Sequence, residues 1–307
     1  MQKSKPLFIL IALFTVTMWG LTFVSTKSLI NAGMTPFGIF MSRFAIAYLC
    51  ILAICHKQFC AKSFRDELFF ASMGLTGGSL YFMTENTALG ITFASNVAML
   101  ISTTPLLTLF AGHFMIHTKI TRRAILGGLI ALVGVALVVY NGAVNFGINP
   151  LGDLLTILAA ICWAVYCVQI KQIDGQYTNL FITRKVFFYG LITGLLFLPF
   201  VDPAFLSGSG YWSMPVFEIK FKTLIANITS PVIIWNLLFL GLIASFLCYF
   251  LWNITIKAIG PAKAANFIYF NPLVAIIASS IILHEPLSAA TLAGAAAIIA
   301  GVYLSTR

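Results

Sequence analysis

The stretch Met18-Trp-Gly-Leu-Thr-Phe-Val-Ser-Thr-Lys27 decides the fold, because it recurs as Cys162-Trp-Ala-Val-Tyr-Cys-Val-Gln-Ile-Lys171, at an offset of 144 residues. Outward from it, Phe40-Met-Ser-Arg43 recurs as Phe181-Ile-Thr-Arg184 at an offset of 141. The offset then becomes 167 and holds without gaps for the pairs Gly74/Gly241, Asn86/Asn253, Pro105/Pro272, His117/His284, Gly127/Gly294 and Gly134/Gly301. The chain is therefore an internal repeat of one long segment.

The composition places this repeat in a membrane. Of the 307 residues, 60% are hydrophobic and 8% are charged, whereas a soluble domain has about 25% charged residues. This excludes a soluble globule. The formal net charge of +10 is better explained by the placement of charge against a bilayer than by nucleic-acid binding, so no nucleic-acid partner is expected.

Ten apolar runs are long enough to cross a bilayer, which takes about 20 residues each. They cover about 7–30, 36–55, 67–90, 93–117, 122–140, 151–171, 180–201, 231–252, 261–284 and 288–305. We predict an all-α polytopic membrane protein with ten transmembrane helices. Residues 1–145 form the first repeat, with helices 1–5. Residues 146–307 form the second, with helices 6–10 and an extended outer loop at 202–230. Because five is an odd number, the second repeat enters the membrane from the opposite face and is inverted.

The basic residues predict the orientation. Alternation of the ten spans places 12 of the 18 Lys and Arg residues on the side that holds both termini. Loops rich in Lys and Arg face the cytoplasm. Both termini are therefore predicted to be cytoplasmic.

Several local motifs accompany the repeat: Trp19-Gly20, Arg43, the run Ala94-Ser-Asn to Pro105, and His284-Glu285-Pro286-Leu287-Ser288 followed by Gly294 and Gly301. Through these motifs and the repeat, the chain resembles the EamA-type ten-helix transporters of the drug/metabolite transporter superfamily over nearly its whole length. The resemblance implies export of amino acids or other small metabolites across an inner (plasma) membrane, without ATP. One departure is Thr118, where the family often has Glu.

Inverted repeats are typical of secondary carriers, whose halves exchange inward-open and outward-open shapes around a central site. We therefore expect a carrier that exports a small organic metabolite by alternating access. Three alternatives stay open: an exchanger for phosphorylated or nucleotide-sugar-type solutes, a passive channel, and an intramembrane enzyme. The channel and the enzyme are less favoured, because neither a polar stripe along every pore helix nor a catalytic cluster is visible. The four His residues stand alone, so no metal and no cofactor is expected.

Glu85 is the acidic residue deepest inside a predicted span, where an unpaired charge is costly. It shares a helix stripe with Tyr81, Gly77 and Gly74, so it points into the bundle. Two interpretations compete. Glu85 forms a structural ion pair with Arg43, which lies at a similar depth, or it is a cavity carboxylate that titrates during transport or binds a substrate amine.

Polar and aromatic residues in the middle of other helices are further cavity candidates. The full set is Trp19, Thr22, Tyr81, Glu85, Asn96, Met99, Trp163, Tyr166, Tyr249, Asn253, Asn266 and Tyr269. Pro105 and Pro272 are predicted mid-helix kinks that act as pivots. Gly127 with Gly134, and Gly294 with Gly301, predict close helix packing, either within the fold or in a homodimer. The expected partners are a small-molecule substrate, the lipid bilayer, coupled protons and a second copy of the chain.

Overall fold

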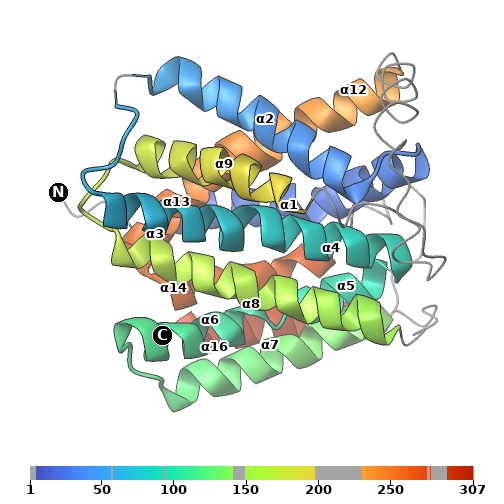
Figure 1. The fold of residues 1–307 in the computed structure, drawn as a ribbon. Helices are drawn as coiled ribbons and strands as arrows, with labels where there is room; N and C mark the ends of the chain where they lie inside the picture. Colours follow the sequence, from blue (N-terminus) through green and yellow to red (C-terminus); the bar gives the residue numbers. More distant parts are fainter. Residues whose placement is uncertain are drawn as a thin grey trace.

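The computed structural model describes residues 5–56, 58–92, 94–140, 149–197, 230–274, 277 and 289–306. All regular structure in these ranges is helical (Figure 1). Most of the predicted outer loop, and the His284–Ser288 turn, lie outside the described residues.

The first half of the chain is formed by α1 (Lys5–Asn31), α2 (Pro36–Ile54), α3 (Phe64–Gly74), η1 (Leu75–Ser79), α4 (Leu80–Ile91), α5 (Ala94–Ile101), α6 (Thr104–Ile116) and α7 (Arg122–Tyr140). The second half contains α8 (Pro150–Gln172), α9 (Asn179–Leu195), α12 (Pro231–Leu238), η3 (Phe239–Leu247), α13 (Cys248–Ile259), α14 (Pro261–Ala265), η4 (Asn266–Phe270) and α16 (Ala289–Thr306). Among the described residues, seven helical stretches are long and apolar enough to cross a membrane. The chain is an all-α polytopic membrane protein.

Local chemistry explains where several helices begin. The side chains of Thr35, Ser63, Asn149 and Thr178 each accept a hydrogen bond from a backbone N–H in the first turn of the following helix. Such N-caps satisfy donors that have no partner inside the helix. Proline occupies the first turn of α2, α8, α12 and α14, where its missing N–H costs nothing.

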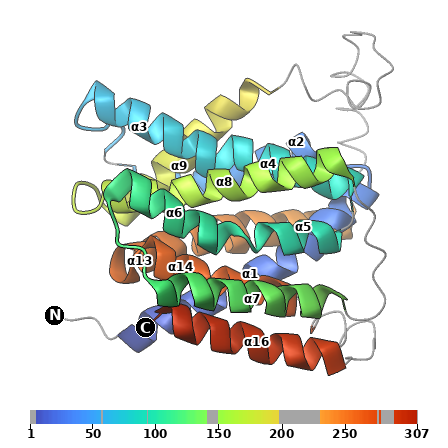
Figure 2. The ribbon, with the colours of Figure 1, turned by 90° about the horizontal axis from the view of Figure 1, so that it is seen from below.

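The halves run in opposite directions. In Figure 1 the span α3–η1–α4 runs from left to right, and its repeat counterpart α12–η3–α13 runs from right to left. Figure 2 shows that α1 begins and α16 ends at the same end of the bundle. We call this end, which carries Lys62, Lys171, Lys185 and Lys257, the basic end.

Helices α7 and α16 show the inversion at the level of single residues. A Cβ on Gly127 would lie 2.6 Å from the carbonyl oxygen of Gly301, and one on Gly134 would lie 2.7 Å from that of Gly294. Gly294 and Gly301 are the repeat counterparts of Gly127 and Gly134, so each glycine meets the counterpart of the other. This exchange is the signature of a two-fold axis. The glycine rows therefore pack within the fold, and they provide no surface for a homodimer.

The long spans are interrupted at matching positions. The π-helix η1 corresponds, at an offset of 167, to residues 242–246 inside the π-helix η3. Single π-helical turns within α-helices are rare and are often found at functional sites.

The prediction of mid-helix proline kinks needs a correction. Pro105 lies in the first turn of α6, after a break at Ser102 and Thr103, rather than in the middle of a continuous helix. Pro272 follows the 3₁₀-helix η4 and lies in the helical turn formed by residues 271–274. Each proline starts a new helical segment, because the first turn needs no N–H from it.

Candidate functional site

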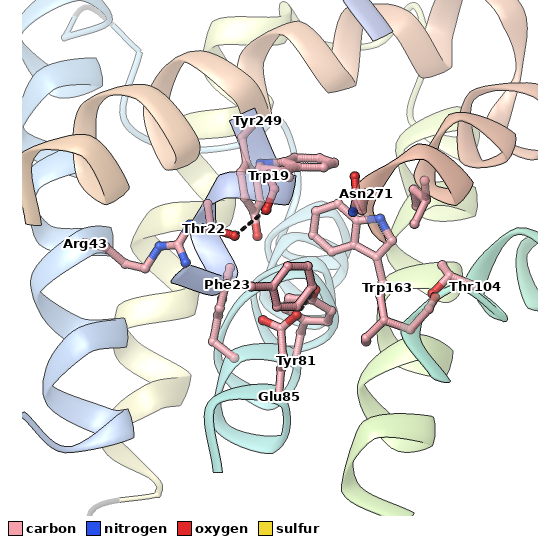
Figure 3. A pocket seen from close by; sticks show the side chains of 13 residues that line it. Trp19, Thr22, Phe23, Arg43, Tyr81, Glu85, Thr104, Trp163, Tyr249 and Asn271 are labelled. Atoms are coloured by element: carbon pink, nitrogen blue, oxygen red, sulfur yellow. Dashed lines mark hydrogen bonds between the residues drawn. The ribbon is translucent and has the colours of Figure 1, made fainter. Parts of the chain in front are cut away.

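A small cavity of about 40 Å³ lies at the centre of the bundle, between the two halves (Figure 3). Since one water needs about 10–15 Å³ by this measure, the space holds only about three waters. The lining residues are Trp19, Thr22, Phe23, Arg43, Tyr81, Phe82, Glu85, Ile101, Thr104, Trp163, Tyr249, Ile268 and Asn271. Anything larger enters only if the walls move apart.

The cavity lies on the axis that relates the two halves. Eight of its lining residues are four pairs of repeat counterparts: Trp19/Trp163 at the offset of 144, and Phe82/Tyr249, Ile101/Ile268 and Thr104/Asn271 at 167. The other five, Thr22, Phe23, Arg43, Tyr81 and Glu85, all come from the first half. The walls are thus nearly symmetric, whereas the charged groups are not.

Aromatic rings form one wall of the cavity. Trp19 and Trp163 meet edge to face, with ring centroids 5.1 Å apart, and the Tyr249 ring lies 5.5 Å from that of Trp163. The Tyr81 ring is 5.0 Å from Trp163. These edge-to-face and tilted geometries are favourable for aromatic contacts and form an aromatic wall suited to an apolar or cationic group.

Two aromatic residues of this wall are tied to the π-helices. Trp19 Nε1 donates to the Ala244 carbonyl in η3 at 2.9 Å, and Tyr249 Oη donates to the Gly77 carbonyl in η1 at 2.7 Å. Gly77 and Ala244 are repeat counterparts at the offset of 167. Both π-helices therefore present the same carbonyl to the cavity wall, because a π-turn shifts the helical hydrogen-bond register.

Two opposite charges face this cavity without contacting each other. Arg43 is 3% exposed; its Nε donates to Ser245 Oγ at 2.8 Å, and its guanidinium lies 4.3 Å from the centre of the Phe82 ring. Glu85 is 7% exposed and accepts a hydrogen bond from Tyr81 Oη at 2.7 Å. Figure 3 shows both side chains pointing towards the centre.

One of the two interpretations of Glu85, a contact ion pair with Arg43, is therefore not found in this structure. Among the described residues, salt bridges join Lys171 and Lys257 to Asp174 and Lys185 to Glu67, and none joins these two side chains. The prediction rested on equal depth along two helices, and depth does not determine which way a side chain points across the bundle. The charged tips keep free hydrogen-bonding capacity within the described structure.

Six of the predicted cavity residues do not line the cavity. Tyr166 donates to Asn253 Oδ1 at 3.0 Å, and Asn253 donates to Thr183 Oγ1 at 2.9 Å, a buried network between α8, α13 and α9. Met99 and Tyr269 pack against the α7–α16 core. The other two are Asn96, buried on α5, and Asn266, at a smaller pocket beside Lys263.

Six further lining residues were not predicted from the sequence: Phe23, Phe82, Ile101, Thr104, Ile268 and Asn271. Most of them carried a usable signal. Thr104 and Asn271 immediately precede the matched prolines, and Ile101 and Ile268 lie three residues earlier. Residues beside a matched helix break lie near the axis in both halves. The offset of 167 could therefore have identified both members of each pair as lining residues.

The fold and the cavity define a class of protein: two inverted helical halves around a central cavity form a membrane transporter. Comparison with known proteins agrees. A model described as the EamA-like transporter family matches residues 6–140 and again 150–307, and the chain belongs to this family. It is an integral membrane protein and a transporter of the EamA type.

Individual relatives are similar over nearly their full length. A protein of Archaeoglobus fulgidus named an uncharacterized transporter is 25% identical, over 95% of this chain and 96% of its own. A protein of Salmonella typhimurium named a probable amino-acid metabolite efflux pump is 24% identical, over 96% and 93%. One solved crystal structure matches with a TM-score of 0.71 at 17% identity, over 98% and 96%, which shows the same fold.

Proposed function

We propose that this chain is a secondary carrier that exports a small organic metabolite bearing both a carboxylate and an ammonium group, such as an amino acid. The observation that carries this proposal is the pair of separated, buried charges in one aromatic cavity. Arg43 and Glu85 are both almost fully buried, yet they do not neutralise each other by contact. Buried intramembrane charges are costly and usually functional.

The chemistry of the two groups suits a zwitterion. The guanidinium of Arg43 uses its Nε on Ser245, which leaves the two Nη atoms to bind a carboxylate in a fork. Glu85 uses one oxygen on Tyr81, which leaves the other for an ammonium group. The Trp19 and Trp163 rings supply a surface for the rest of the solute. The relative named as an amino-acid metabolite efflux pump supports this solute class.

Alternating access supplies the movement that the small cavity requires. The inverted halves meet at the cavity, so a rocking of one half against the other would open it first to one end and then to the other. We propose that Glu85 carries a proton across in this cycle, because it is the carboxyl group among the lining residues.

The exchange of phosphorylated solutes is a weaker candidate. Dianionic phosphate groups are usually bound by several Arg or Lys side chains, and Arg43 is the basic residue among those that line the cavity. Lys27, a basic residue near the end of α1, donates to the Leu89 carbonyl at 2.9 Å. Arg184 donates to backbone carbonyls at the basic end, including that of Cys55.

The direct test is a thermal-shift screen of the purified full-length protein against amino acids, simple amines, carboxylic acids and nucleotide sugars. A ligand that binds only the folded form raises its melting temperature. We expect stabilisation by zwitterions, followed by their accumulation in proteoliposomes under a pH gradient. Stabilisation by nucleotide sugars alone would favour the exchanger and contradict the proposal.

For the orientation, we propose that the basic end faces the cytoplasm of a cell with an inner (plasma) membrane, as the distribution of Lys and Arg predicts. A cysteine in place of the exposed Asn31, at the opposite end, should react with an impermeant maleimide added to intact cells. Ser63→Cys, in the link before α3, should not react until the membrane is opened. Labelling of the Ser63 variant in intact cells would reverse the orientation.

A further inference from the structure

Glu67 holds the two halves together at the basic end. Both oxygens of its carboxylate accept a hydrogen bond from Lys185 Nζ, at 2.7 and 2.8 Å, and Oε2 also accepts one from the Tyr189 hydroxyl at 2.5 Å. The backbone N–H of Ala61 donates to it as well, at 2.6 Å. Glu67 and Ala61 belong to the first half, and Lys185 and Tyr189 lie on α9 of the second. Four donations to one carboxylate make a strong, charge-assisted contact.

A second contact of the same kind lies beside it. Tyr177, in the link between α8 and α9, donates from its hydroxyl to Asp66 Oδ2 at 2.6 Å, and the Tyr177 hydroxyl oxygen in turn accepts from the backbone N–H of Lys62 at 2.7 Å. The Nζ of Lys62 donates to the Gln176 carbonyl at 3.0 Å. We name Asp66, Glu67, Tyr177, Lys185 and Tyr189 the interhalf latch.

The positions that the repeat relates to the charged latch residues are apolar. At the offset of 167, Asp66 and Glu67 correspond to Ile233 and Ile234. At the offset of 141, Lys185 corresponds to Phe44, which is fully buried among aromatic rings. In an exchange of shapes between the halves, these apolar residues would therefore take the places of the charged latch residues.

From this asymmetry, and resting on the alternating access of the proposed function, we propose that the interhalf latch holds the empty carrier closed at its basic end and must break in every transport cycle. Asp66, Glu67 and Lys185 are charged, whereas their repeat counterparts are apolar, so the latch biases the equilibrium towards the state in which its contacts are formed.

Cys167 is a suitable reporter, because it is fully buried on α8 between Trp163 at the cavity and Lys171 at the basic end. The experiment uses the full-length protein with the other five cysteines replaced by serine, in vesicles that expose the basic end to an impermeant maleimide. Glu67→Gln and Lys185→Gln should each raise the labelling rate roughly five- to twentyfold, which lies within the range of coupling energies between contacting polar groups. The double variant should react no faster than the faster single.

The charge-reversed pair distinguishes a latch from general loosening. Glu67→Lys with Lys185→Glu should slow the labelling again, whereas each reversal alone should be fast. Arg122→Gln, which removes an exposed charge at the same end, should change the rate less than twofold. If a charge variant does not fold, judged by its melting temperature, Tyr189→Phe removes a single hydroxyl and should still give roughly a twofold rise.

Unchanged labelling in the folded single variants would overturn the proposal, as would a reversed pair that stays fast. The labelling needs no transported solute. A failed transport screen together with latch-dependent labelling would therefore reject the proposed solute and leave the latch in place. Latch-independent labelling in a protein that transports amino acids would reject the latch alone.

Discussion

Arg43→Gln is expected to remove the binding of zwitterionic solutes while leaving a folded protein. Truncating one side of a buried, hydrogen-bonded charge pair costs about 2 kcal/mol or more, which corresponds to at least a roughly thirtyfold loss of affinity. Because Arg43 has no ion pair with Glu85 in this structure, its loss does not strand a bonded carboxylate. The measurement is the dissociation constant of the full-length variant for an amino acid and for the matching amine that lacks the carboxyl group.

The informative result is the difference between the loss of affinity for the amino acid and the loss of affinity for the amine. The amine should bind the Arg43 variant as well as it binds the original protein, since it has no carboxylate to lose. Arg184→Gln is the matched control, because Arg184 is the repeat counterpart of Arg43 but donates to backbone carbonyls at the basic end. An equal loss of affinity for amino acid and amine would contradict the role of Arg43 in carboxylate binding.

Glu85→Gln is expected to give a folded protein that no longer couples transport to a pH gradient. Glutamine keeps a carbonyl oxygen for the Tyr81 hydroxyl but cannot exchange a proton and carries no charge for an ammonium group. Accumulation driven by a pH gradient should fall to background. Affinity for the amino acid should fall roughly tenfold or more, as expected for a lost hydrogen bond to a charged group.

Melting temperatures of the two single variants and of the double variant Arg43→Gln with Glu85→Gln provide the control. Because Arg43 and Glu85 share no contact, the changes in melting temperature of the two single variants should nearly add up to the change in the double variant. Recovery of stability in the double variant would instead indicate the salt bridge that the structure lacks. Unchanged pH-driven accumulation in Glu85→Gln would exclude Glu85 as the proton carrier.

Much of the architecture was predictable from the sequence. The repeat offsets indicated two halves, and the apolar runs indicated membrane helices, because both depend on spacing along the chain. Of the predicted substrate-cavity residues, Trp19, Thr22, Tyr81, Glu85, Trp163 and Tyr249 lie at the central cavity, and their contact with a substrate stays a prediction. These residues are polar or aromatic in apolar spans, where hydrocarbon forces such groups to find partners inside the bundle.

Tertiary structure alone decided three other features. It separated Arg43 from Glu85, because the direction of a side chain across the bundle depends on neighbours such as Phe82 and Ser245 rather than on depth. It turned the predicted proline kinks into helix starts. It brought Glu67 to Lys185, 118 residues further along the chain. Local spacing determines which elements form and in which order, whereas contacts between distant elements depend on how the assembled helices rotate and pack against each other.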